Sequence, residues 1–123
     1  MSSIVAWFDI PVDDMSRAIK FYEALTGQRL TRLPVKPGAE TALFESGNEG
    51  EVSGCLFSSP DDTPSMHGSR VYLNANPSLD AWLARVEPAG GRIAVGKTPI
   101  PHRGFFAYII DTEGNRVGLH ANA

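Results

Sequence analysis

Three histidines and one cysteine are the residues of this 123-residue chain best suited to proton transfer or metal binding. The histidines, His67, His102 and His120, do not follow the His-x-His or His-Glu-x-x-His spacing that is typical of metal sites. His67 lies in a polar segment and is expected to be a solvated loop residue. His102 follows a Pro-Ile-Pro run, so it is either an exposed loop residue or part of a lid over a binding site.

His120 lies at the end of a predicted strand, and side chains along a strand alternate between the two faces of a sheet. Arg116, Gly118 and His120 therefore share one face. A histidine beside a ligand could act as a general acid or base, because its ordinary pKa is about 6.5. The alternative is a strand-end histidine that hydrogen-bonds the backbone or a partner subunit. Similarly, Asp9 with Arg116 is either an ordinary ion pair or a clamp for a ligand.

The elements that must position these residues repeat along the chain with an offset of 64 residues. The offset aligns Gly27 with Gly91, Gly54 with Gly118, Met15 with Leu79, and Ile19 with Leu83. One constant shift thus aligns helix with helix and turn with turn, which indicates two similar modules. We expect one domain over 1–123, with modules at about 4–58 and 69–121 and a Pro-, Ser- and Asp-containing linker over 59–68.

Each module has the pattern of a strand, a helix and three further strands. Asp13 and Asp14 predict the start of the first helix and Gly27 its end, whereas Ser78 predicts the start of the second. A hairpin is expected at 46–50 and another at 111–114. The predicted strands are 4–10, 30–33, 41–45, 52–57, 70–75, 92–95, 105–110 and 116–120. The order βαβββ, repeated twice, belongs to the α+β class.

Three segments resemble the glyoxalase/bleomycin-resistance/dioxygenase superfamily, also called vicinal oxygen chelate proteins. They are the D-x-x-R-A-x-x-F-Y run that begins at Asp14, the segment 90–93, and the Asp-Thr-Glu-Gly-Asn hairpin that begins at Asp111. The Val-Gly-Leu-His ending is similar to a branch described as related to lactoylglutathione lyase. The resemblance implies two βαβββ modules whose eight strands form a cup-shaped mixed sheet, often in a homodimer.

The resemblance also implies where a metal would bind. Aligned by the helix run and the hairpins, the four metal-ligand positions of the family correspond to Trp7, Gly54, Val71 and Gly118. None of these side chains is a ligand for a divalent ion. This departure from the family's pattern removes the basis for a glyoxalase I or extradiol dioxygenase assignment, and we expect neither a metal nor another cofactor.

A cup without metal ligands is expected to hold a small, partly apolar, anionic compound. The face that includes Gly118 predicts its lining, with Arg116 as the anion contact and His120 as the candidate catalytic residue. The predicted ligand-binding residues are Trp7, Asp9, Leu56, Val71, Arg116 and His120. Trp7 is interpreted either as a flat wall against a ligand or as an ordinary core aromatic, and Cys55 as buried and inert.

Composition restricts the remaining classes of function. The formal net charge is −3 and no basic patch stands out, which argues against nucleic-acid binding. A single cysteine, the lack of a leader-like N-terminus and the lack of a long apolar run predict a cytoplasmic protein with no membrane partner.

Three functions remain open. The first is a metal-independent small-molecule binder of the glyoxalase-like type. The second is a lyase, isomerase or dioxygenase-type enzyme with a noncanonical site. The third is an interaction module whose cup is filled by its own side chains.

Overall fold

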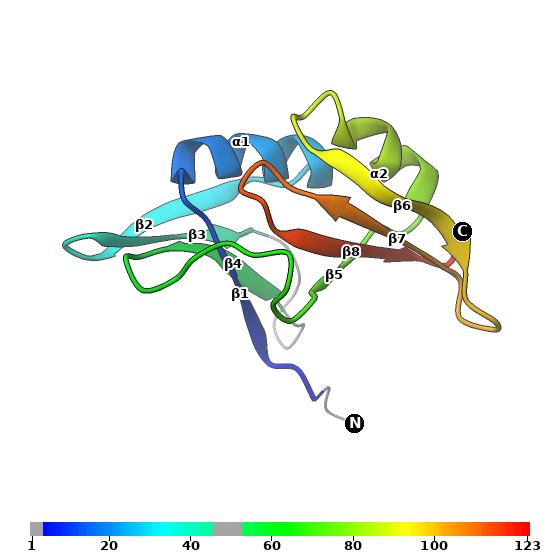
Figure 1. The fold of residues 1–123 in the computed structure, drawn as a ribbon, viewed down its shortest axis with the longest axis horizontal. Coiled ribbons are helices and arrows are strands. Elements are labelled where there is room, and N and C mark those ends of the chain that lie inside the picture. Colours follow the sequence, from blue (N-terminus) through cyan, green and yellow to red (C-terminus); the bar gives the residue numbers. More distant parts are fainter. Residues whose placement is uncertain (1–3, 46–52) are drawn as a thin grey trace.

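The computed structural model describes residues 4–45 and 53–123, so the hairpin expected at 46–50 lies outside the described residues (Figure 1). The first module contains β1 (Trp7–Pro11), α1 (Met15–Thr26), β2 (Leu30–Lys36), β3 (Ala39–Phe44) and β4 (Ser53–Ser58). The second contains β5 (Tyr72–Asn74), α2 (Leu79–Val86), β6 (Arg92–Pro99), β7 (Phe105–Ile110) and β8 (Arg116–Ala121). This order confirms the prediction of a twofold βαβββ arrangement of the α+β class.

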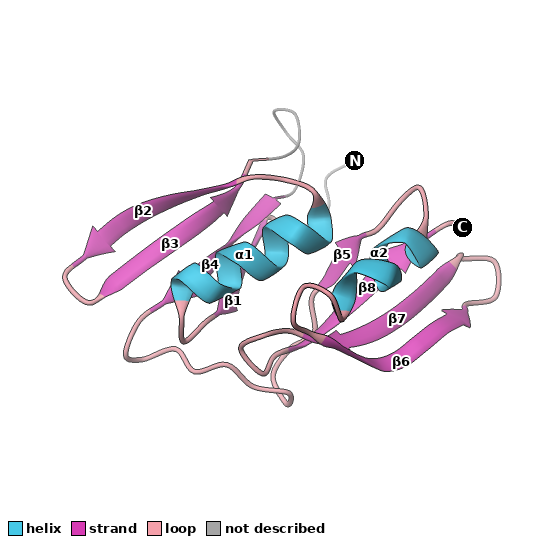
Figure 2. Cartoon of the chain, turned by 90° about the horizontal axis from the view of Figure 1, so that it is seen from above, coloured by secondary structure: helices cyan, strands magenta, loops and turns pink. Residues whose placement is uncertain are grey.

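The strands form two four-stranded sheets, ordered β1-β4-β3-β2 and β5-β8-β7-β6. In each sheet the first strand of the module runs parallel to the last, and the other pairs are antiparallel. In the described part of the chain no ladder joins β1 to β5, so the eight strands form two sheets rather than one. Seen from above, α1 and α2 lie over the same side of the two sheets (Figure 2).

The helices begin and end where the sequence predicts. The Asp14 side chain accepts a hydrogen bond from the Arg17 backbone N–H at the start of α1, and Ser78 does the same for Ala81 at the start of α2. Gly27 ends α1 with a φ of 73°, a left-handed conformation that glycine adopts without steric cost. None of the helices in the described segments is long and apolar enough to cross a bilayer.

One hydrophobic core serves both modules, and its cross-strand contacts identify the buried face of each sheet. Leu56 pairs with Ile10 and Ala42, and all three are buried. Leu119 pairs in the same way with Leu73 and Ala107. We call the side of each sheet that carries these residues the helix face and the opposite side the open face.

These triplets correct the constant repeat offset. Ile10 corresponds to Leu73 and Leu56 to Leu119, so β1 and β4 are related to β5 and β8 by 63 residues, whereas the helices keep 64. Five positions separate Ile10 from Met15, but six separate Leu73 from Leu79, the first residue of α2. The expected equivalence of Trp7 with Val71 is therefore wrong. Val71 instead corresponds to Phe8, and both side chains pack against the core.

Hydrogen bonds join the last hairpin to the start of α1. The Glu113 carboxylate accepts hydrogen bonds from the backbone N–H groups of Asp13 and Asp14, at 2.9 and 2.7 Å. It also accepts two from the Arg17 guanidinium, at 2.7 and 3.0 Å. Glu113 thus satisfies N–H groups at the positive end of α1, although it is nearly one hundred residues away in the sequence.

A second set of buried hydrogen bonds extends this junction. The Tyr22 hydroxyl donates to Asp111 Oδ2 at 2.6 Å, and the Asn115 amide donates to the Pro11 carbonyl at 2.7 Å. Burial, together with the nearby Asp111 carboxylate, raises the pKa of Tyr22 well above its ordinary value. Both segments that carry the family resemblance thus have a structural role, because they hold the two modules together.

Candidate functional site

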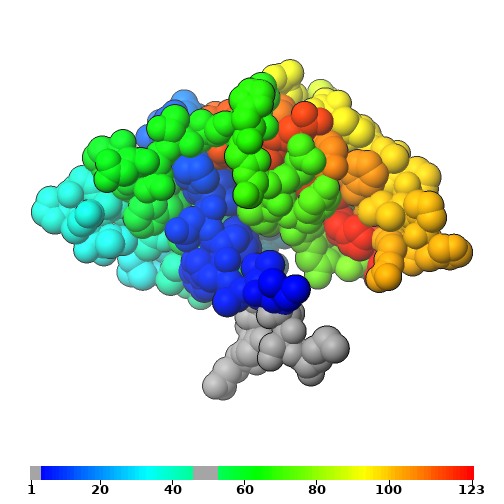
Figure 3. Space-filling view, turned by 60° about the horizontal axis from the view of Figure 1, so that its bottom comes forward, coloured from blue at the N-terminus to red at the C-terminus, as the bar shows by residue number. Residues whose placement is uncertain are grey.

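The largest cavity in the described part of the chain lies between the two modules and has a volume of about 600 Å³. Small-molecule sites in proteins usually have volumes of about 300–1,000 Å³. Its wall includes residues from β1, the end of α1, β3, β5 and α2. In the space-filling view, the N-terminal segment (blue) lies beside the green segment that leads into β5 (Figure 3).

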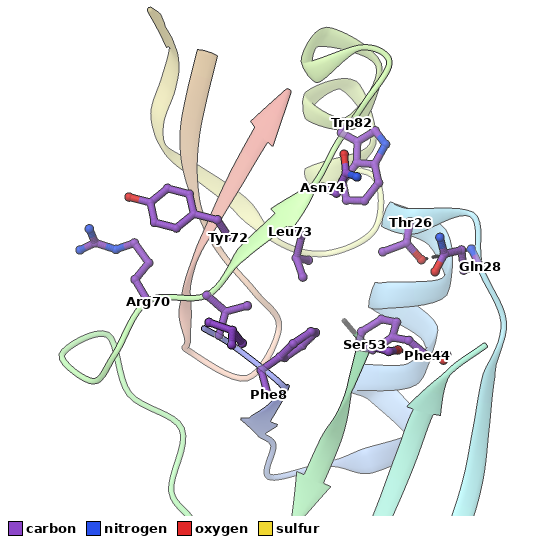
Figure 4. Close-up of a pocket in the computed structure, with 12 residues that line it drawn as sticks. Phe8, Thr26, Gln28, Phe44, Ser53, Arg70, Tyr72, Leu73, Asn74 and Trp82 are labelled. Atoms are coloured by element: carbon purple, nitrogen blue, oxygen red, sulfur yellow. Dashed lines mark hydrogen bonds between the residues drawn. The ribbon is translucent and has the colours of Figure 1, made fainter. Parts of the chain in front are cut away.

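The wall of this cavity is mostly apolar. Phe8 and Phe44 come from the first module, with ring centroids 6.0 Å apart. Leu73 and Trp82 come from the second module, and Figure 4 shows them on the opposite side of the space. The polar groups of the wall are uncharged side chains at its edges: Thr26, Gln28, Ser53 and Asn74. An apolar body with a few polar contacts is the ligand that such a wall fits.

Arg70 and Tyr72 also border this space, but in Figure 4 their side chains project from the other side of β5. They lie on the open face of the second sheet, where the Tyr72 and Tyr108 hydroxyls are hydrogen-bonded at 2.8 Å. The Arg70 guanidinium carbon is 4.1 Å from the centre of the Tyr108 ring, and that of Arg116 is 5.0 Å from the same centre. These four residues form what we call the tyrosine–arginine cluster.

Two glycines lie beneath aromatic rings at equivalent pairing positions. Gly54 pairs with Phe8, and Gly118 pairs with Tyr72. A Cβ built on either glycine would lie 2.5 Å from the ring of its partner. The rings thus occupy the space that a longer side chain would need at Gly54 or Gly118.

Of the residues predicted to bind a ligand, Trp7 and Asp9 lie on the open face of the first sheet. The Trp7 side chain is 49% exposed, and its indole N–H donates to Asp9 Oδ1 at 3.1 Å. The Cys55 thiol, which is buried on the same face, also donates to Asp9 Oδ1 at 3.1 Å. Burial raises the pKa of this thiol, so it remains protonated at neutral pH.

Asp9, Val71 and Arg116 border a small crevice of about 40 Å³ between β1, the linker and β8. No ion pair joins Asp9 to Arg116 among residues 4–45 and 53–123. Leu56, in contrast, has no exposed surface and packs in the core. The expectation that Leu56 shares a face with Trp7 is wrong, because β4 turns Cys55 rather than Leu56 to the open face.

The histidines do not converge on a common site. His120 lies on the open face of the second sheet, and its Nε2 is 2.7 Å from the carbonyl oxygen of Arg103. This contact matches the backbone-bonded alternative for His120. His102 is exposed in the turn between β6 and β7, with a φ of 63°, and His67 is exposed in the linker.

The positions expected to match the family's metal ligands do not fit a metal. Trp7 and Gly118 lie on the open faces of different sheets, while Gly54 and Val71 lie on the helix faces. None of the four side chains is a donor for a divalent ion. Within 4–45 and 53–123, no group of three or more His, Cys, Asp or Glu side chains is placed to hold a metal ion.

Sequence reasoning missed Arg70, Tyr72 and Tyr108. The signal was available in part, because the prediction already placed Gly118 and Arg116 on the open face. Tyr72 pairs with Gly118 from one side and Tyr108 pairs with it from the other. The one-residue error in the repeat offset assigned this position on β5 to Val71 instead of Tyr72.

Comparisons with known proteins agree with this architecture. The curated relatives include a protein named "Putative glyoxylase CFP32" from Mycobacterium tuberculosis, 29% identical over 108 residues. The match covers 88% of this chain and 40% of the relative, so the chain spans less than half the length of that protein. A Mycobacterium bovis relative of the same name matches equally well.

Solved structures with the same fold include TnmS3, an antibiotic binding protein from Streptomyces sp. CB03234. It is 25% identical, with a TM-score of 0.73, and the match covers 98% of this chain and 97% of TnmS3. A V278E mutant of glyoxalase I from Zea mays has the same TM-score at 24% identity, and 45% of that chain is covered. The model of the Glyoxalase/Bleomycin resistance protein/Dioxygenase superfamily matches residues 4–119. With both βαβββ modules inside this match, the chain belongs to that superfamily.

Proposed function

We propose that this protein binds a small, mostly apolar molecule without a metal ion, in the cavity between its two modules. The observation that carries the proposal is the cavity itself, with a volume of about 600 Å³ and a wall of aromatic and aliphatic side chains. None of the described residues in that wall is a histidine, cysteine, aspartate or glutamate. The similarity to TnmS3, an antibiotic binding protein, also favours binding over a metal-dependent reaction.

Binding of a neutral apolar dye tests this proposal. N-phenyl-1-naphthylamine fluoresces in apolar surroundings and carries no charge to attract the arginines. We expect saturable binding of one dye per chain, with the same affinity before and after exhaustive treatment with EDTA. Dye binding that requires added Zn²⁺ or Ni²⁺ would contradict the proposal, as would a lack of saturable binding.

Two substitutions locate the dye. Val71→Phe fills the cavity from the half-buried side, and Gln28→Trp narrows it from an exposed position that does not touch the core. Each should weaken dye binding at least tenfold. The matched control is Val35→Phe, because Val35 is 54% exposed on the open face of the first sheet, outside the cavity wall. Equal binding by Gln28→Trp and the control, both folded by circular dichroism, would exclude this cavity as the site.

We also propose that the chain forms a homodimer. The open face of the first sheet exposes the apolar side chains of Trp7, Leu33 and Val35, each more than 40% exposed. The two sheets also leave β1, β2, β5 and β6 at their edges, and exposed edges favour pairing or coverage. Light scattering during gel filtration should give twice the 13.3 kDa chain mass at micromolar concentration. A mass of one chain would contradict the dimer and leave the cavity proposal unaffected.

A further inference from the structure

The open face of the second sheet carries two arginines and two tyrosines at one place. Arg70 comes from the segment before β5, Tyr72 from β5, Tyr108 from β7 and Arg116 from β8. Tyr108 lies at the centre, since both guanidinium groups contact its ring and its hydroxyl bonds to Tyr72. Residues that are far apart in the sequence thus direct their polar ends to a single region.

The positive charge of this cluster is not neutralised by the protein. The ion pairs among the described residues are Arg17–Glu113, Arg32–Glu40 and Lys97–Asp80, and none includes Arg70 or Arg116. The closest candidate, Asp9, shares a crevice with Arg116 but receives its hydrogen bonds from Trp7 and Cys55. Two guanidinium groups without a carboxylate partner are unusual in a chain whose net charge is −3.

The cluster also has hydrogen-bond donors to spare. Only one of the two phenol protons is used in the Tyr72–Tyr108 hydrogen bond, whichever hydroxyl donates, so the other is free to donate to a ligand. The buried Nε of Arg116 has no hydrogen-bond partner. The hydrogen bond with Tyr72 and the positive charge of Arg70 lower the pKa of Tyr108, which agrees with a surplus of positive potential at this position.

The fixed geometry makes the cluster a ready binding site. The face of the Tyr108 ring holds Arg70 in place through a cation–π contact, which reduces the entropy lost when the guanidinium binds an anion. The ring of Phe106, 5.0 Å from that of Tyr108, extends the aromatic surface. Gly118, between Tyr72 and Tyr108 in the sheet, leaves no side chain above the strand between them.

We infer that Arg70, Tyr72, Tyr108 and Arg116 form a binding site for the oxyanion group of an organic compound with a flat apolar body. The two arginines supply charge-assisted hydrogen bonds, the free phenol proton supplies a third donor, and Phe106 offers a surface for the body. This site is on the opposite side of β5 from the cavity between the modules, so it stands or fails independently of the proposed function.

Titration calorimetry with matched probes tests the inference. The probes are benzoate and phenyl phosphate, which present the two forms of the oxyanion, and benzamide as the uncharged analogue of benzoate. We expect at least one anionic probe to bind tenfold or more tightly than benzamide, with an affinity that falls as the salt concentration rises. Comparison of the two anions shows whether the site prefers a carboxylate or a phosphate. Equal binding of benzoate, phenyl phosphate and benzamide would overturn the inference.

Substitutions assign the binding to these side chains. Arg70→Gln and Arg116→Gln should each weaken the tighter anion about tenfold, and Tyr108→Phe should weaken it several-fold. The control is Arg29→Gln, since Arg29 is exposed in the other module. An equal loss in the control would show nonspecific attraction to positive charge and would overturn the inference. Arg70 is exposed, so its substitution leaves the fold intact, and unchanged anion binding by folded Arg70→Gln would also overturn it.

Discussion

Glu113 and Arg17 form a two-point ion pair, in which Arg17 Nε lies 2.7 Å from Glu113 Oε2 and Arg17 Nη2 lies 3.0 Å from Oε1. The Glu113 side chain is fully buried, while that of Arg17 is about half exposed. The pair joins the last hairpin of the second module to the first helix of the first module. Its function is to fix the arrangement of the modules, on which the cavity between them depends.

Glu113→Gln should lower the free energy of unfolding by about 1.5–3 kcal/mol, the usual range for a hydrogen bond to a charged group. The substitution keeps the shape of the side chain but removes the charge that Arg17 and the start of α1 stabilise. Glu40→Gln is the matched control. It breaks the exposed pair with Arg32 and should cost less than about 1 kcal/mol. Urea unfolding at pH 7 measures both, and equal losses would show that the Glu113 pair has no special weight.

The same carboxylate predicts an acid-sensitive fold. Burial by itself would raise the pKa of Glu113, but the hydrogen bonds from Arg17, Asp14, Thr112 and Asp13 outweigh it and lower the pKa. A lowered pKa in the folded state means that this stabilisation is complete above the ordinary glutamate value of about 4.3 and is lost as the pH falls through the folded value. Unfolding curves from pH 7 to pH 3 should therefore show a steeper loss of stability for the native sequence than for Glu113→Gln. Parallel curves would contradict this assignment.

Gly118→Ala should disturb the tyrosine–arginine cluster. The added Cβ would lie about 2.5 Å from the Tyr72 ring, so the ring must move and its hydrogen bond to Tyr108 must break. Overpacking of this kind usually costs about 1–3 kcal/mol. Gly96→Ala is the control, since a Cβ at Gly96 would meet no atom within 4 Å. Thermal unfolding measures the effect on stability, and an unperturbed Gly118→Ala variant would show that the ring has room to move.

Leu56→Ala should destabilise the protein much more than Trp7→Ala, although both positions were predicted to line a binding site. Leu56 has no exposed surface, and truncation of a buried leucine costs about 2–5 kcal/mol. Trp7 is half exposed, so it loses fewer contacts when truncated. Chemical unfolding of the two variants provides the comparison. A larger loss for Trp7→Ala would mean that this residue is covered in solution, for example by a second copy of the chain.

Local patterns in the sequence determined the order of elements and their ends. Asp14 and Ser78 begin the helices, and Gly27 ends the first, because capping depends on side chains only a few residues from the helix terminus. The Asp-Thr-Glu-Gly-Asn hairpin and the D-x-x-R-A-x-x-F-Y run indicated the family, whose model matches residues 4–119. The sequence did not reveal that these two segments bond to each other through Glu113 and Arg17.

The tertiary structure decided which side chains share a face. Alternation along a strand has a period of two, so a single additional residue between β5 and α2 reverses the face assigned to every position on β5. The helices keep the repeat offset of 64 residues and conceal this change, which is why Val71 was expected where Tyr72 lies. Only the strand pairing, with Tyr72 and Tyr108 on either side of Gly118, brings the two tyrosines together with Arg70 and Arg116. Pairing depends on contacts between distant strands, and no local pattern specifies them.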